Sequence, residues 1–189
     1  HQATTVMYSS LFWASVRCGE ETGQIQPQTW LLGSSGQSAA WAGEQGMDYA
    51  YAQFFTGRQD TGIMDHYRAH LSDGFPGRTL SAVCVSAAPT RQEALEQSLM
   101  AANFRVSLGT GRPVTFVTAS QMDAETRSLL TSYVLSNEDT IFVGDYDEVA
   151  DKLTAFQDAH HVDELMLISY IDNVQTKVER YRQLAKRLI

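Results

Sequence analysis

A crossover unit over residues 30–55 restricts the fold of this chain more than any other stretch. An apolar run at residues 30–32 ends at Gly33, a loop of small polar residues follows, and helix-forming residues continue over 36–45. Residues 49–55 are rich in aromatic side chains and are expected to form a second strand. Two strands joined by a helix through short connections lie parallel, with a right-handed crossover. The unit therefore predicts a parallel sheet with helices packed against it.

The rest of the chain continues to alternate strands and helices. Residues 78–87 form the clearest strand, and their unbroken run of small and β-branched side chains predicts burial on both faces. With the strands at 29–32, 49–55 and 164–170, the chain has four convincing strands, half of an eight-stranded barrel. Helices are expected near residues 4–18, 36–45, 60–72, 90–102, 123–135, 145–156 and 173–188. The last of these places Val174, Val178, Tyr181 and Leu184 on its inward face.

Length and composition fit a single domain over residues 1–189, of which 43% are hydrophobic. Within it, residues 1–24 form a lead-in helix and residues 105–121 form an insertion. A formal net charge of -8 argues against nucleic acids and anionic membranes as partners. The cysteines at positions 18 and 84 lie in unlike contexts, so neither a disulfide framework nor a zinc site is expected.

No apolar run approaches the roughly 20 residues needed to cross a bilayer. We therefore expect a cytoplasmic protein. The chain begins with His1 rather than Met, and no basic region precedes an apolar segment as in a signal peptide. These features are consistent with a fragment or a trimmed product.

The loop between the first strand and its helix is the clearest candidate for a binding site. Ser34 or Ser35 can cap the helix, while Gly33 and Gly36 let the backbone bend so that several N–H groups point into one concavity. Such a concavity suits an anion, most often a phosphate. The alternative for both serines is helix capping without a ligand, and the sequence does not decide between the two.

Histidine pairs are the other candidate ligands. His66 and His70 stand four residues apart on one predicted helix, a spacing that can ligate a metal. No third ligand is evident, and His160 and His161 occupy a predicted turn. We expect no metal site.

The order and spacing of several motifs make the chain similar to the C-terminal half of the bacterial luciferase-like flavin monooxygenases, in particular their alkanal-monooxygenase-like members. The motifs extend from about residue 29 to residue 188. They comprise residues 30–40, residues 46–54, Val143-Gly144, residues 162–166, Asp172, Arg180-Tyr181 and Leu184-Ala185.

The resemblance implies a partial TIM barrel whose strands correspond to the second half of the barrel. In this family, FMN binds at the C-terminal ends of the strands, and its phosphate is held by the loop after the fifth strand. By resemblance, the phosphate ligands fall on Ser34, Ser35, Gly36 and Ser38. Gln53 would lie near the flavin ring or its substrate.

The implied function is that of an oxidoreductase, a monooxygenase that uses reduced FMN and oxygen on an aldehyde-like or other small organic substrate. The first four strands, the basic residues that neutralise the phosphate and the family's catalytic histidine have no counterpart here, so we assign no catalytic residue and expect this chain alone to be inactive. The alternative is a catalytically inactive flavin-binding or self-associating half-barrel module.

A half barrel has two open edges and an uncovered inner face, which a partner must cover. We therefore expect a homo-oligomer, most simply a dimer that buries the 49–55 face or an open edge, or association with a missing N-terminal half.

Overall fold

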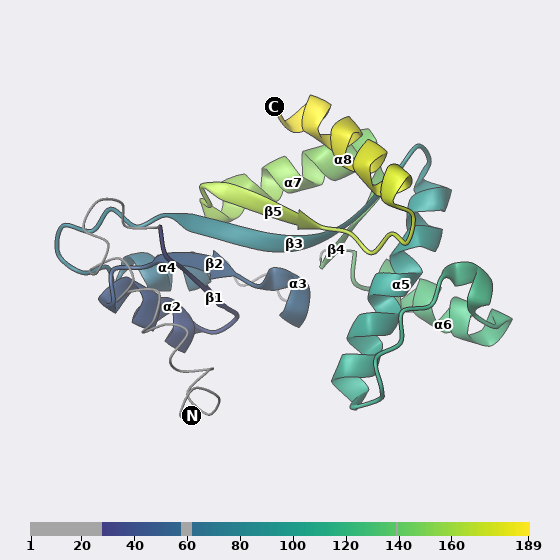
Figure 1. Cartoon of the computed structure of the whole chain (residues 1–189), viewed down its shortest axis with the longest axis horizontal. Helices are drawn as coiled ribbons and strands as arrows, with labels where there is room; N and C mark the ends of the chain where they lie inside the picture. Colours follow the sequence, from purple (N-terminus) through teal and green to yellow (C-terminus); the bar gives the residue numbers. More distant parts are fainter. Residues whose placement is uncertain (1–27, 58–61, 139) are drawn as a thin grey trace, which may run out of the picture.

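Five parallel strands form one open sheet in the computed structural model, which describes residues 28–57, 62–138 and 140–189 (Figure 1). The strands are β1 (Trp30–Gly33), β2 (Asp48–Tyr51), β3 (Thr79–Ala88), β4 (Ile141–Asp145) and β5 (Glu164–Ile168). The helices are α2 (Gly36–Glu44), α3 (Gln53–Thr56), α4 (Gly62–Arg68), α5 (Arg91–Thr110), α6 (Ala124–Leu135), α7 (Tyr146–His160) and α8 (Val174–Leu188), with a 3-10 turn η1 (Ala119–Gln121). The predicted α/β class is confirmed. The helix predicted over residues 4–18 and the lead-in over 1–24 lie outside the described residues.

Strand β3 pairs with three other strands and organises the sheet. Leu80 is in register with Ala50 of β2 and with Glu164 of β5, while Cys84 is in register with Ile141 of β4 and with β5. Because each strand has two edges, β2 and β4 must lie one after the other along the same edge of β3, opposite β5. The four strands predicted from the sequence therefore follow the order β1-β2-β3-β5, as expected of a half barrel, and β4 extends this sheet beyond the end of β2.

Helices α2, α4, α7 and α8 cover one side of the sheet, which we call the outer face. On β1 and β2 the rings of Tyr49 and Tyr67 stack with centroids 5.6 Å apart. On β3, Val83 and Val85 pack against a cluster that includes Leu153 of α7 and the almost fully buried Leu184 of α8.

The opposite side, the inner face, is covered only in part. Ala50, Leu80 and Ala82 form a small buried cluster there with Trp30, Phe54 and Ile168. Beyond it, α5 and α6 pack over the C-terminal part of β3 and β4, around Cys84 and Ile141. The whole of β3 is buried as a result, which confirms the prediction that both of its faces are covered. Elsewhere on the inner face Leu32 is 60% exposed and Met166 is 51% exposed.

One secondary-structure expectation is wrong. The strand predicted over residues 49–55 ends at Tyr51, and Gln53–Thr56 form the short helix α3, which ends at the left-handed Gly57. A short apolar run does not by itself distinguish a strand from a buried helical turn. Residues 105–110, which lie within the predicted insertion, continue α5, and residues 112–118 have no regular secondary structure.

The prediction of which α8 residues point inward is also wrong in part. Leu184 is buried, but Val174 is 65% exposed and Val178 is 48% exposed. The α8 residues that pack in the cluster with α7 and the sheet, Tyr181, Leu184 and Leu188, lie in the C-terminal half of the helix. No helix in the described ranges is long and apolar enough to cross a membrane.

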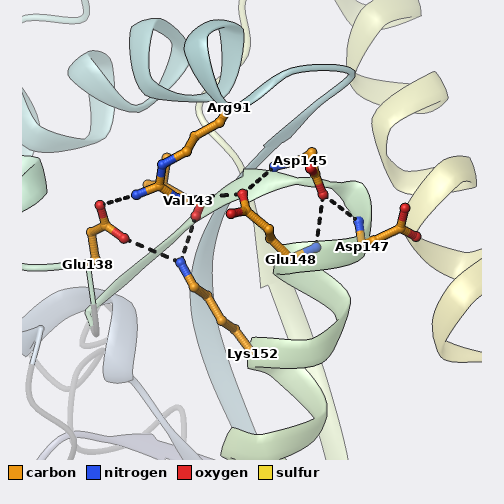
Figure 2. Close-up of polar contacts among 7 residues, drawn as sticks. All are labelled: Arg91, Glu138, Val143, Asp145, Asp147, Glu148 and Lys152. Carbon is orange, nitrogen blue, oxygen red and sulfur yellow. Dashed lines mark hydrogen bonds and ion pairs between the residues drawn. The ribbon is translucent and has the colours of Figure 1, made fainter.

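A network of charged side chains joins the ends of β3 and β4 to α7 (Figure 2). Glu138 accepts hydrogen bonds from Arg91 and from Lys152 (3.4 Å), and the Lys152 ammonium also donates to the carbonyl of Val143 (2.9 Å). Asp145 caps α7 by accepting hydrogen bonds from the backbone N–H groups of residues 147 and 148. The carboxylates of Asp145, Asp147 and Glu148 therefore occupy the N-terminus of this helix themselves.

Helices α2 and α4 approach so closely that one glycine cannot be enlarged. A Cβ atom on Gly43 would lie 2.8 Å from the carbonyl oxygen of His70 and 2.9 Å from that of Tyr67. We predict that Gly43→Ala lowers the free energy of unfolding by about 1–3 kcal/mol, although alanine favours helices. Denaturant unfolding measures this. Gly109→Ala in α5, where no atom lies within 4 Å of the new Cβ, is the control and should stabilise by about 0.5–1 kcal/mol. Equal effects at both sites would contradict the close contact.

The Glu138 network predicts a dependence of stability on pH. Burial raises the pKa of Glu138, but the hydrogen bond and charge of Arg91 and the charge of Lys152 outweigh it and hold this pKa below its usual 4.5. Stability from the network is therefore present above pH 4.5 and lost as the pH falls through the lowered pKa. We expect Glu138→Gln to destabilise by about 1 kcal/mol at pH 7 and progressively less under acid conditions. Glu125→Gln, at an exposed site on α6, is the control. A loss that is constant with pH would be the contrary result.

Candidate anion site at the end of the first strand

Ser35 and Ser38 form a reciprocal cap at the N-terminus of α2, directly after β1. The Ser35 Oγ accepts a hydrogen bond from the Ser38 backbone N–H (3.3 Å), and the Ser38 Oγ accepts one from the Ser35 N–H (3.3 Å) while donating to the Ser35 carbonyl (2.7 Å). Helix geometry leaves the amides of Gly36 and Gln37 without intrahelical acceptors. The capping expected of Ser35 is confirmed, and donors remain available at this helix end.

The surroundings of the loop favour an external anion. The first turn of α2 contains no acidic residue, whereas α7 carries Asp147 and Glu148 in its first turn and Asp145 as its cap (Figure 2). Among the described residues, no acidic side chain in the first turn of α2 therefore neutralises the helix dipole and its N–H groups. Ser34 is half-buried at the start of the loop.

Two residues that no sequence pattern links to this loop lie beside it. The Tyr49 hydroxyl lies 3.2 Å from the Ser38 Oγ and 3.4 Å from the Ser35 carbonyl oxygen, so β2 helps to hold the cap in place. His66 of α4 lies beside Gly36, since a Cβ on that glycine would be 3.6 Å from the His66 Nε2. Both contacts join elements far apart in sequence, and no local pattern predicts them.

Close packing between Gly33 and Ser38 also shapes the loop. A Cβ atom on Gly33 would lie 2.2 Å from the Ser38 Oγ and 2.6 Å from the Ser38 Cβ. Only glycine leaves room for the Ser38 side chain to turn back into the cap. The glycine that ends the strand is therefore needed for the geometry of Ser38, five residues later.

Gln53 lies on the neighbouring strand end, at the start of α3. The Ala52 N–H donates to the Gly33 carbonyl (2.8 Å), so the ends of β1 and β2 are side by side at the C-terminal edge of the sheet. Gln53 is fully buried, and its Nε2 donates to the Thr140 carbonyl (3.3 Å). Its Oε1 has no hydrogen-bond partner among the described residues. The structure thus places Gln53 near the same edge as the serines but joins it to a different segment.

A buried arginine, also missed by the sequence reasoning, fixes this region. Arg105 donates to the Phe54 carbonyl (3.2 Å) and to the Thr140 hydroxyl and carbonyl (2.7 and 2.8 Å).

Burial raises the pKa of the nearby Cys84 thiol to about 11, although the charge of Arg105 acts in the opposite direction. Cys84 therefore remains a neutral thiol at physiological pH and is no candidate nucleophile. It forms no disulfide.

The described histidines form no metal site. The rings of His66 and His70 lie 4.4 Å apart, and the His70 Nδ1 lies 2.8 Å from the His66 carbonyl oxygen. Within the described ranges, no group of three His, Cys, Asp or Glu side chains is arranged to hold a metal ion.

Comparison with known proteins identifies relatives about twice as long as this chain. No family model matches. The chain is 29% identical over 166 residues to the uncharacterized protein YwcH of Bacillus subtilis, which covers 84% of the chain and 49% of that protein. It is 26% identical over 169 residues to the N-acetyl-S-alkylcysteine monooxygenase of the same organism, covering 87% of the chain and 50% of the relative. The chain thus spans about half the length of these relatives.

Solved structures agree in fold and extent. The crystal structure of apo-MsnO8 superposes with a TM-score of 0.69 at 28% identity, covering 87% of this chain and 52% of MsnO8. The oxygenating constituent of 3,6-diketocamphane monooxygenase from Pseudomonas putida, a complex with FMN, superposes with a TM-score of 0.55 at 16% identity, covering 88% and 49%. At this identity the second match supports the fold alone. Together with the curated relatives, these matches confirm that the chain resembles one half of a luciferase-like flavin monooxygenase with a partial TIM-barrel fold.

Proposed function

We propose that this chain is the C-terminal half of an FMN-dependent monooxygenase acting on an aldehyde-like or other small organic molecule. One observation carries the proposal: an uncompensated helix N-terminus with serine hydroxyls lies at the C-terminal end of a parallel strand, where TIM barrels bind phosphates and perform chemistry. The donors of this loop, hydroxyl and backbone N–H groups, fit a phosphate. The relatives add support, since one is named a monooxygenase of N-acetyl-S-alkylcysteines.

In this proposal the chain's own residues bind and orient the cofactor. Ser34, Ser35, Gly36 and Ser38 hold the phosphate at the start of α2. Tyr49 holds the serine cap, and Gln53 lies at the adjacent strand end, near the flavin ring or substrate. Reduced FMN supplies the oxygen chemistry. We assign no catalytic residue to this chain, and full activity requires the half that the relatives possess.

The alternative is a flavin-binding or self-associating module without catalysis. It shares the phosphate loop and differs only in lacking turnover after the missing half is supplied. We further propose a single domain with an insertion at residues 105–121, and a cytoplasmic location consistent with the free thiol of Cys84.

Two substitutions at Ser35, whose new side chains are isosteric with each other, separate helix capping from phosphate binding. Asparagine and aspartate are both good N-caps, so neither Ser35→Asn nor Ser35→Asp should destabilise the fold appreciably. The aspartate places a negative charge beside the phosphate, and we expect it to weaken FMN binding roughly tenfold or more, while asparagine retains most of the affinity. Fluorescence titration with FMN and thermal unfolding measure the two effects.

Ser128→Asp, at an exposed site on α6, controls for added charge alone and should leave FMN affinity unchanged. Equal FMN affinities for the Ser35→Asn and Ser35→Asp proteins would rule out phosphate binding at this loop.

We also propose that the uncovered inner face is the site of self-association when the missing half is absent. Of the 49–55 face that we expected a dimer to bury, residues 49–53 are already buried within the chain, whereas Phe55 is 49% exposed. Leu32 and Met166 remain exposed on the inner face.

Light scattering of the unmodified chain should show an oligomer. The double substitution of Leu32→Lys with Met166→Lys should shift this oligomer toward the monomer. The control combines Leu129→Lys with Leu135→Lys, at exposed positions of α6, and should leave the oligomer unchanged. A monomeric unmodified chain would overturn this assignment.

A further inference from the structure

Three aromatic rings stand together beyond the end of β5. Phe104 comes from α5, Phe116 from the segment after α5, and Tyr170 from the segment after β5. Their centroids lie 5.5–6.0 Å apart in all three pairs, with interplanar angles of 13–30°. Phe116 is 62% exposed, so the group presents aromatic surface to solvent. Nearly parallel rings of this kind offer a surface on which another planar ring can stack.

The aromatic group borders a cavity of about 630 Å³. Met100, Phe116, Ile168, Tyr170, Asp172 and Lys177 are among its lining residues. A smaller cavity of about 380 Å³ shares Met100, Tyr170 and Asp172 with it. The larger volume lies within the range of about 300–1,000 Å³ that is typical of small-molecule sites.

The cavity lies where the proposed function places the substrate. Ile168 packs in the inner-face cluster with Leu80 and Ala82, so the cavity adjoins the C-terminal end of the sheet. The Tyr181 hydroxyl accepts hydrogen bonds from the Ser169 N–H (3.1 Å) and Oγ (2.9 Å), which fixes the segment after β5. One wall of the cavity is therefore held rigidly by α8.

The wall carries two charged groups, Lys177 and Asp172, and the Lys177 cation can bind an anionic substituent on the ligand. The Lys177 ammonium makes no ion pair or hydrogen bond with any described residue, Asp172 included. Burial raises the pKa of the Tyr170 phenol, with the nearby Cys84 adding to the effect, so the phenol stays protonated and can donate a hydrogen bond. Apolar and aromatic walls with one available cation suit a planar aromatic carboxylate.

We propose that this cavity binds a planar aromatic carboxylate, stacked on Phe116 and Tyr170, with its carboxylate at Lys177. Identifying this ligand as the substrate rests on the proposed function, but its binding does not. The site would give the enzyme a substrate class defined by ring stacking and one negative charge.

Calorimetric titration of the chain without flavin tests the proposal, with 2-naphthoate as the probe. Saturable binding of 2-naphthoate, with weaker binding of 2-naphthol and of the aliphatic octanoate, is the expected result. Phe116→Leu retains an apolar side chain at an exposed position and should weaken 2-naphthoate and 2-naphthol alike, by roughly threefold to tenfold. Lys177→Met should weaken 2-naphthoate by a similar factor and leave 2-naphthol unchanged.

The matched controls are Leu129→Ala for the aromatic residue and Lys186→Met on α8 for the cation, and neither should change affinity. Three results would overturn the aromatic assignment: no binding of 2-naphthoate, binding of octanoate as strong as that of 2-naphthoate, or unchanged 2-naphthoate affinity in Phe116→Leu. Unchanged affinity in Lys177→Met overturns the carboxylate assignment. Because Ser35→Asp affects only the phosphate loop, it should retain 2-naphthoate binding, so failure of the FMN proposal is distinguishable from failure of this one.

Discussion

The structure depends on the pairing of β3 with three strands. Its ten residues are buried on both faces and are shared between β2, β4 and β5. The outer helices pack on one side of this strand, and α5 with α6 pack on the other side at its C-terminal end. Side chains on both faces therefore have to be small or β-branched, as in the run from Ser81 to Ala88. Through these pairings β3 connects the two halves of the described sheet.

Features decided by local sequence could be predicted. The parallel strands follow from short crossovers, and the cap at Ser35 follows from a serine placed directly before helix-forming residues. The boundary of β2 could not be predicted, because residues 49–55 have the same apolar character on either side of Tyr51. The orientation of Val174 and Val178 failed for another reason: helical periodicity identifies an apolar stripe but not whether another element covers it.

The candidate site shows the same division. The serines and glycines of the phosphate loop are adjacent in sequence, so their chemistry was evident. Tyr49, His66 and Arg105 enter through tertiary contacts with partners between 11 and 51 positions away, and no spacing rule brings them together. Residues that hold a loop in position are therefore harder to infer from sequence than residues whose own backbone forms it.

The shared edge of β3 has a consequence for Gln53. Pairing with β2 ends at Ser81 and pairing with β4 begins at Cys84, so a two-residue interval separates the strands along that edge. Gln53 follows the end of β2, and its side chain bonds to the carbonyl of Thr140, which precedes the start of β4. Arg105 bonds to the same carbonyl. A single amide thus spans the break between two strands, so any ligand that displaced it would also change how the two strand ends are held together.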